Sequence, residues 1–251
     1  MNQKNVFVYW IGPSFSLVDL LRKIMQYHAN NGQHYTLHII NETNLSDYVS
    51  ELPNYFHQLN PAYRADYVRV AVVERFGGIW LDSDTLVMNN LSELFKIFET
   101  HQGFFIQQNN ELICNGVFGS KAATPLMSAW RQTIFQRIEQ QGTNLEWSEL
   151  GNLWLDKTYH TTQLFNQYQI YPGLDTMYPV NWNHCVAEFL QKPYPHYQKL
   201  IRPFQPLVVL VNSVYRALEN KSIPEILSAN TPLTYFLKES LRQGLQTKHL
   251  P

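Results

Sequence analysis

Two aspartates, Asp82 and Asp84, follow the bulky apolar run 79–81, which itself comes after a double glycine. Such a run predicts a short buried strand over 79–82, and residues i and i+2 of an extended chain point to the same side. Two carboxylates directed at one point repel each other unless a cation or a proton lies between them. Hard cations such as Mg²⁺ and Mn²⁺ prefer oxygen ligands and often combine one or two carboxylates with substrate phosphates. The pattern indicates a divalent metal site, although a bare Asp-x-Asp is more often a solvated surface turn.

A helix predicted over 62–76 leads directly into this strand. Asn60 and Pro61 supply a favourable N-cap and a proline at the first helical position. Asp66 and Arg69 are three residues apart, so they share one face of the helix. On a helix that stands alone, such a pair is an ordinary surface ion pair of little worth. Because this helix continues into the strand, the pair is expected close to the two aspartates.

The block 65–84 resembles the signature of the glycosyltransferases with a DXD-containing sugar-binding region. That group includes bacterial capsule and lipopolysaccharide sugar transferases and fungal mannosyltransferases, and it is similar to the catalytic domains of the large clostridial glucosylating toxins. The resemblance implies a GT-A type α/β fold and a hexosyltransferase of polysaccharide biosynthesis. It further implies a nucleotide-sugar donor, with a UDP-sugar expected, a glycan or protein acceptor, Mn²⁺ or Mg²⁺ as cofactor, and retention of the anomeric configuration.

The same resemblance assigns roles to the four residues of the predicted catalytic set. Asp84 would bind the metal directly, and Asp82 would bind it through water and touch the ribose. Asp66 and Arg69 would hold hydroxyl groups of the donor sugar, and a guanidinium can also reach phosphate oxygens. No nucleophile is implied, so the expected reaction is a front-face attack in which the departing phosphate takes the proton of the acceptor.

Other segments fit the same template. The run 6–13 resembles the opening strand of the family. The resemblance implies that Trp10 stacks on the nucleobase and that Gly12 belongs to the same substrate-binding segment. The alternative for Trp10 is a packing role in the core. Asn115 matches the asparagine that follows the DXD in the family and would form a hydrogen bond with the donor sugar. The segment 149–152 stands where the family has a loop near the acceptor.

One departure from the family pattern concerns the metal. Many relatives carry a histidine ligand in a late segment, and Val209 occupies that position here. Valine cannot bind a metal, so Asn212 or Ser213 would supply an oxygen to the metal or a donor to the phosphate. The predicted metal ligands are therefore Asp84, Asp82 and Asn212.

Two alternatives stay open. The Asp-x-Asp-x-Thr sequence also resembles the nucleophile loop of haloacid-dehalogenase-like phosphatases, in which Asp82 would attack phosphorus and Asp84 would act as the acid. That fold needs a downstream acidic pair, whereas Asp156 and Asp175 stand apart. The other alternative is a catalytically inactive sugar-nucleotide-binding protein, which the missing histidine would favour. Mn²⁺-dependent hydrolysis of a sugar nucleotide separates that alternative from an enzyme.

Composition limits the remaining possibilities. A chain of 251 residues is long enough for one sizeable core. The net charge of -1, without a basic run, argues against a nucleic-acid partner. Cys114 and Cys185 are expected to be reduced and structural. The sequence has no apolar stretch of transmembrane length and no signal peptide, so a cytoplasmic protein is expected, with peripheral membrane association left open.

The order of the elements predicts the fold class. A single domain over 1–251 is expected, with a mainly parallel sheet flanked by helices and a C-terminal helical segment over about 215–250. Ligands would bind at the carboxyl ends of the strands, where the DXD lies. The predicted strands are 6–11, 35–40, 79–82, 104–108, 112–119 and 207–211, and the predicted helices before the C-terminal segment are 17–29, 62–76, 91–100 and 124–140.

Overall fold

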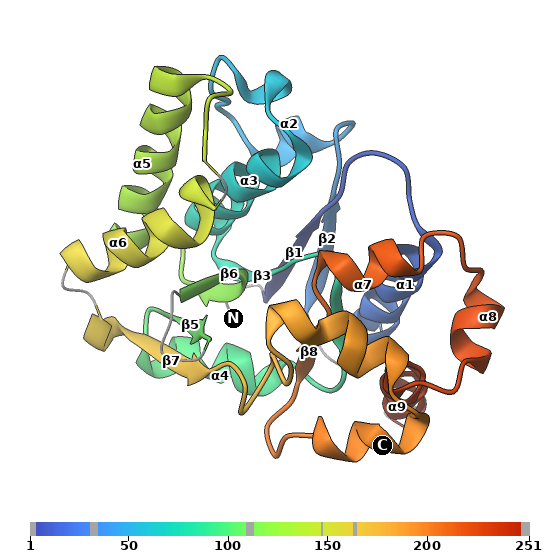
Figure 1. Cartoon of the computed structure of the whole chain (residues 1–251). Helices are drawn as coiled ribbons and strands as arrows, with labels where there is room; N and C mark the ends of the chain where they lie inside the picture. Colours follow the sequence, from blue (N-terminus) through green and yellow to red (C-terminus); the bar gives the residue numbers. More distant parts are fainter. Residues whose placement is uncertain (1–3, 31–34, 109–112, 147, 163–164, 247–251) are drawn as a thin grey trace. The chain divides into compact units, whose positions relative to one another are not determined.

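The structure is a computed structural model that describes residues 4–30, 35–108, 113–146, 148–162 and 165–246 (Figure 1). Residue 112 and residues 247–250 of the predicted elements lie outside these described residues. The contacts divide the chain into two compact units. Unit 1 contains Met1–Ile11, Thr36–Asp82 and Glu93–Tyr171, and unit 2 contains Gly12–Tyr35, Ser83–Ser92 and Pro172–Pro251. The single domain expected over the whole chain stays a prediction.

Unit 1 is built on a six-stranded sheet with the order β2-β1-β3-β6-β5-β7. Strand β1 is parallel to both β2 and β3, whereas β6 is antiparallel to β3 and β5. The α/β class and the parallel strands are confirmed, and β6 reverses direction because it follows β5 through a short connection, as antiparallel neighbours do. The strands are β1 (Asn5–Tyr9), β2 (Thr36–Ile40), β3 (Gly78–Leu81), β5 (Gly103–Gln107), β6 (Ile113–Ser120) and β7 (Tyr168–Pro172).

The central helix of unit 1 is α3, and its boundaries follow from its sequence. The side chain of Asn60 accepts a hydrogen bond from the Tyr63 amide at 3.0 Å, and Pro61 occupies the first turn. The helix ends at Gly77, whose φ of 65° suits glycine. The helices of unit 1 are α2 (Leu45–Tyr48), α3 (Pro61–Phe76), α4 (Ser92–Thr100), α5 (Pro125–Gln141) and α6 (Trp154–Thr162), with the π-helical segment η2 (Glu149–Leu153) before α6.

Helix α3 is buried around most of its circumference, which fixes the direction of its polar side chains. Tyr67, Val68, Val70 and Val72 have no exposed surface, and they belong to the core shared with strands β1, β3 and β6 and with helix α5. Close packing of this kind leaves little freedom for the backbone to shift. The core therefore holds the Asp-x-x-Arg face of α3 as a rigid support for a site.

Unit 2 contains a two-stranded antiparallel ribbon and helices from three parts of the chain. The ribbon pairs β4 (Thr85–Val87) with β8 (Leu207–Val209), so the predicted last strand forms outside the six-stranded sheet. The helices are α1 (Ser16–Asn30), α7 (Asn212–Ala217), α8 (Ile223–Ser228) and α9 (Pro232–Gln246), so the part of the predicted C-terminal segment that the structure describes is largely helical. Cys114 and Cys185 are both buried. No helix within the described ranges is long and apolar enough to cross a membrane.

A buried histidine in unit 2 is expected to make the fold sensitive to acid. His28 on α1 is 1% exposed, and its Nε2 lies 3.1 Å from Oγ of Ser240 on α9. Burial lowers the pKa of His28 to about 4, although the Ser240 contact opposes this shift. The neutral imidazole is thus favoured in the folded state, and the stability it confers is lost as the pH falls from about 6.5 towards 4.

We therefore expect urea denaturation to show a loss of up to about 3 kcal/mol in unfolding free energy over this pH range. His28→Gln removes the titrating group and should flatten this part of the pH profile. Parallel profiles for the two proteins would show that His28 does not carry the acid sensitivity.

Candidate active site

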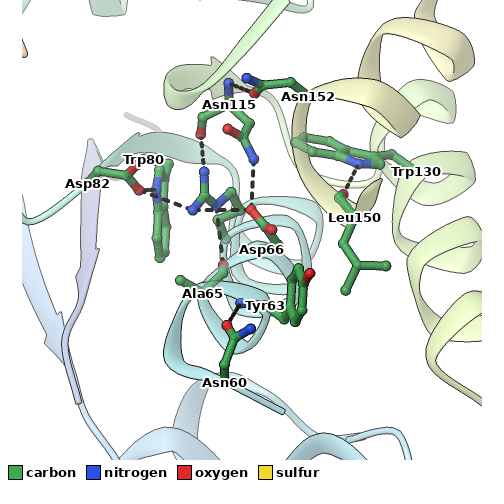
Figure 2. A network of polar contacts seen from close by, with 11 residues as sticks. Asn60, Tyr63, Ala65, Asp66, Trp80, Asp82, Asn115, Trp130, Leu150 and Asn152 are labelled. Atoms are coloured by element: carbon green, nitrogen blue, oxygen red, sulfur yellow. Dashed lines mark hydrogen bonds and ion pairs between the residues drawn. The ribbon is translucent and has the colours of Figure 1, made fainter. Parts of the chain in front are cut away.

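Asp66, Asp82 and Asn115, three of the predicted residues of unit 1, contact the guanidinium of Arg69. Figure 2 shows these three side chains gathered in one network of polar contacts. Nη2 of Arg69 lies 3.3 Å from Oδ1 of Asp66 and 3.3 Å from Oδ1 of Asp82. Its Nε donates to the Ala65 carbonyl at 3.2 Å, and its Nη1 donates to the Asn115 carbonyl at 2.8 Å. Arg69 itself is only 5% exposed. One buried arginine therefore ties helix α3, the end of β3 and strand β6 into a single polar cluster, called the Arg69 cluster below.

Asp82 is held by groups that contact one of its two carboxylate oxygens. The indole Nε1 of Trp80 donates to Oδ1 at 2.8 Å, which is the same oxygen that Arg69 contacts. The amide of Asp82 donates to the Gly116 carbonyl at 2.8 Å, which anchors the backbone to β6. The Asp82 side chain remains 30% exposed. Among the described residues these side-chain contacts involve Oδ1, so Oδ2 is the oxygen best placed to meet a ligand.

The chain geometry after Asp82 differs from the prediction. Strand β3 ends at Leu81, and residues 83–84 form a turn before β4 begins at Thr85. The alternation rule holds only for extended backbone, so it does not apply between Asp82 and Asp84. The prediction of an extended segment was wrong because the chain leaves the sheet at this point.

The Arg69 cluster places two carboxylates against one cation. The pKa of Asp66 is raised to about 6, mainly by burial and in part by the charge of Asp82, although Arg69 and the hydrogen bond from the Asn115 amide oppose the shift. Burial also raises the pKa of Asp82, against the effects of Arg69 and Trp80. When both acids are ionised, one negative charge of the cluster is not balanced by Arg69. A cation or a hydrogen-bond donor from a ligand would be stabilised at this position.

Asn115 on β6 is fixed by three partners. Its Nδ2 donates to Oδ1 of Asp66 at 2.8 Å, and its backbone amide donates to Oδ1 of Asn152 at 2.9 Å. Its carbonyl accepts the hydrogen bond from Arg69. Sequence reasoning did not select Asn152 or Trp80 as individual site residues. The role of Trp80 could have been inferred from the sequence, because it stands two residues before Asp82 on the same strand. For Asn152 the sequence offered only its position in the segment 149–152, which resembles the loop near the acceptor.

Gly151 lies so close to the cluster that any side chain there should disturb it. A Cβ atom at this position would be 2.4 Å from Nδ2 of Asn115 and 3.0 Å from Oδ1 of Asp66. For the sugar-donor hydrolysis that the sequence predicts, we expect Gly151→Ala to lower the rate at least about tenfold, since misplaced groups are costly in a positioned site. Leu153→Ala, on the same segment and 50% exposed in the native protein, is the matched control. Equal rates in the two variants would show that Gly151 does not shape the site.

Trp10 and Gly12 lie after strand β1. Trp10 is half-buried, and its amide donates to the Ile40 carbonyl at 3.0 Å, so the parallel pairing of β1 with β2 extends to it. Gly12 is exposed with a φ of 88°. The stacking role predicted for Trp10 and the neighbouring role of Gly12 stay predictions.

The other predicted residues belong to unit 2. The carbonyl of half-buried Asp84 accepts a hydrogen bond from the Leu210 amide at 3.1 Å. Asn212 and Ser213 are the exposed first residues of α7. Val209 is 4% exposed and pairs with Thr85, so it serves the core of this unit. The ligand roles predicted for Asp84, Asn212 and Ser213 stay predictions.

Comparison with known proteins identifies the family. Residues 1–194 match the family described as capsular polysaccharide synthesis protein. A glycosyltransferase involved in the glycosylation of the major capsid of PBCV-1 shares the fold, with a TM-score of 0.50, 11% sequence identity, and coverage of 87% of this chain and 98% of that chain. The galactosyltransferase LgtC, solved with donor and acceptor sugar analogs, gives a TM-score of 0.49 at 9% identity, with coverage of 98% of this chain and 97% of that chain.

No curated protein sequence was found to match the chain. The family match spans well over half of the residues, and the arrangement of strands and helices is that of a solved glycosyltransferase. This protein therefore belongs to the capsular polysaccharide synthesis protein family and shares the fold of a solved glycosyltransferase.

Proposed function

We propose that this protein is a metal-dependent, retaining glycosyltransferase that moves a sugar from a UDP-sugar to a glycan acceptor during polysaccharide synthesis. The observation that carries the proposal is the Arg69 cluster, in which Asp66 and Asp82 share one buried guanidinium. The family match supports the sugar chemistry, and the unbalanced negative charge supports a ligand that brings a cation and hydroxyl donors.

The donor sugar would be held by Asp66 and Asn115. A carboxylate accepts hydrogen bonds from hydroxyl groups, and a side-chain amide both donates and accepts. The Nε, Nη1 and Nη2 atoms of Arg69 all make contacts within the protein. Its main task in this proposal is therefore to orient Asp66 and Asp82, with little left to reach a phosphate.

The available oxygen atoms fit a hard divalent cation such as Mn²⁺ or Mg²⁺. Asp84 would bind the ion directly, Asp82 would bind it through water at its open Oδ2, and Asn212 is the third protein group proposed. Among the described residues no three His, Cys, Asp or Glu side chains gather as a metal cage, so the diphosphate of the donor would complete the ligand set. Such an ion stabilises the negative charge that develops on the departing diphosphate.

The proposed reaction keeps the anomeric configuration through attack on the front face. The acceptor hydroxyl oxygen forms a bond to the anomeric carbon on the side where the bond to the phosphate oxygen breaks. The departing phosphate oxygen takes the hydroxyl proton, so no protein base is required. Asp66 and Asn115 would hold the sugar while positive charge develops at its anomeric carbon.

A thermal-shift screen of sugar nucleotides with and without Mn²⁺ tests this function. A ligand present at about 100 times its Kd should stabilise the native state by about 2.7 kcal/mol. For a chain of this size that corresponds to roughly 5–10 °C in Tm. We expect the shift with a UDP-sugar only when Mn²⁺ is present. Shifts that are the same without metal, or absent for every sugar nucleotide, would contradict the proposal.

The nucleobase would stack on Trp10, which is half-buried at the end of β1. We expect Trp10→Ala to weaken UDP binding by about 1–3 kcal/mol, which is the usual contribution of stacking between a base and an aromatic ring. Titration calorimetry with UDP and Mn²⁺ measures the effect, and Trp182→Ala, at a tryptophan that is 61% exposed, is the control. Unchanged affinity would assign Trp10 to packing.

A further inference from the structure

A cavity of about 400 Å³ lies in unit 1, beside the Arg69 cluster but separate from it. Its walls come from the end of α5, from residues 144–146, from η2 and from the start of α6. This volume falls within the range of pockets that bind small ligands. The side chains that face a ligand there include Asn144, Leu145, Glu146, Leu153, Trp154 and Lys157.

The inner wall of this cavity is organised around a buried carboxylate. Glu149 is 8% exposed and accepts hydrogen bonds from Nε of Arg137 and from the Glu146 amide, the latter at 2.9 Å. Burial alone would raise the pKa of Glu149, but the Glu146 amide, Arg137 and the Trp154 indole together hold that pKa below its usual value. Glu149 is therefore ionised and fully engaged. It fixes Arg137 and Trp154 before any ligand arrives.

The chemistry of the cavity suits a sugar ring. A pyranose offers an apolar face of C–H groups and a rim of hydroxyls that both donate and accept hydrogen bonds. The Lys157 ammonium lies 4.3 Å from the centre of the Trp154 ring and covers part of it. Leu153, which is 50% exposed, and the uncovered part of Trp154 provide apolar surface. Asn144 and Glu146 provide exposed donors and acceptors, and Lys157 adds an exposed ammonium.

The charges of the lining argue against a phosphate or a polyanion as the ligand. The two cations of the lining, Arg137 and Lys157, are balanced by the two anions, Glu146 and Glu149. Arg137 is also already paired with Glu149. No excess positive charge therefore remains to attract an anionic group, whereas a sugar can use donors and acceptors together.

Segment η2 forms a wall between this cavity and the Arg69 cluster. Glu149 and Leu153, at its two ends, line the cavity, while Gly151 at its centre lies against Asn115 and Asp66. Asn152 also holds the Asn115 amide. We propose that the cavity binds one pyranose unit of the saccharide acceptor, on the opposite side of η2 from the donor sugar. This inference rests on the function proposed above, because an acceptor exists only for a transferase.

Saturation-transfer NMR of methyl glycosides tests the proposal without nucleotide or metal. The probes are the methyl glycosides of glucose, galactose, mannose, N-acetylglucosamine and glucuronic acid. We expect at least one of them to receive saturation from the wild-type protein. The double variant Asn144→Ala/Lys157→Ala, which changes two exposed side chains, should weaken that binding at least fivefold. Lys96→Ala, at an exposed lysine of α4 in the same unit, should leave it unchanged.

Two outcomes of this NMR test would overturn the proposal. Either no glycoside receives saturation, or the signal is the same in the double variant as in the wild type. We expect no preference for the glucuronide over the glucoside, because the lining carries no excess positive charge; a clear preference for the glucuronide would contradict this account of the cavity.

Hydrolysis of the donor, measured in parallel, distinguishes failure of the proposed saccharide cavity from failure of the proposed glycosyltransferase function. The double variant should hydrolyse a UDP-sugar at the wild-type rate, because water replaces the acceptor in that reaction. Glycoside binding without any hydrolysis by the wild type would remove the proposed function and leave a saccharide-binding cavity. Hydrolysis without glycoside binding would remove only the cavity's role.

Discussion

Arg69→Ala is expected to abolish donor hydrolysis, with a loss of at least about 100-fold, and to destabilise the fold by about 3–5 kcal/mol. The variant leaves Asp66 and Asp82 without the guanidinium that both contact at 3.3 Å. It also removes the donors to the carbonyls of Ala65 and Asn115. Removing one partner of a buried charge pair lowers the free energy of unfolding by more than the intact pair contributes to it, because an uncompensated buried charge remains.

The pH dependence of this loss identifies its cause. Without the cation, the pKa values of both carboxyls should rise further, so protonation should relieve the strain at low pH. Urea denaturation should therefore show a smaller loss at pH 5 than at pH 8. Arg75→Ala, at an exposed residue in the last turn of the same helix, is the control and should cost little at either pH. A loss in Arg69→Ala that is small, or independent of pH, would contradict the bridging role.

Asp84→Asn is expected to reduce Mn²⁺-dependent donor hydrolysis at least about 100-fold while the fold stays intact. An amide of the same shape keeps the packing but removes the negative charge that a hard cation requires. Asp84 is half-buried, and its backbone contact with Leu210 does not depend on the side chain. Circular dichroism and urea denaturation check the fold.

Asp175→Asn, at an exposed aspartate of unit 2, is the control for Asp84→Asn and should keep wild-type activity. Wild-type rates in Asp84→Asn at limiting Mn²⁺ would remove Asp84 from the proposed metal site. A loss that excess Mn²⁺ restores would place the defect in metal affinity and would agree with the assignment.

Local signals in the sequence predicted much of the fold. Helix α3 begins and ends where Asn60, Pro61 and Gly77 indicate, because capping depends on residues adjacent in the chain. The three-residue spacing of Asp66 and Arg69 predicted their shared face, and the direct continuation into β3 predicted that Asp82 lies near them.

Contacts between distant segments could not be predicted in the same way. Asn152 reaches Asn115 across 37 residues of sequence, and only the packing of η2 against β6 brings the two together. The turn after Asp82 was missed because the alternation of side chains assumes that the strand continues. The lining of the cavity beside η2 falls within residues 137–157, but no spacing of residue types in that stretch marks a cavity, because its shape depends on how α5, η2 and α6 pack against one another.

The most direct test of the central claim is the release of free sugar from UDP-sugars, followed by proton NMR with and without Mn²⁺. The proposed function predicts release that stops with EDTA and returns with Mn²⁺, and it predicts that the first product formed has the anomeric configuration of the donor. Release that continues at the same rate in EDTA would contradict the metal dependence, and an inverted first product would contradict the front-face mechanism. No release from any UDP-sugar, together with clear UDP binding, would identify the protein as an inactive sugar-nucleotide binder.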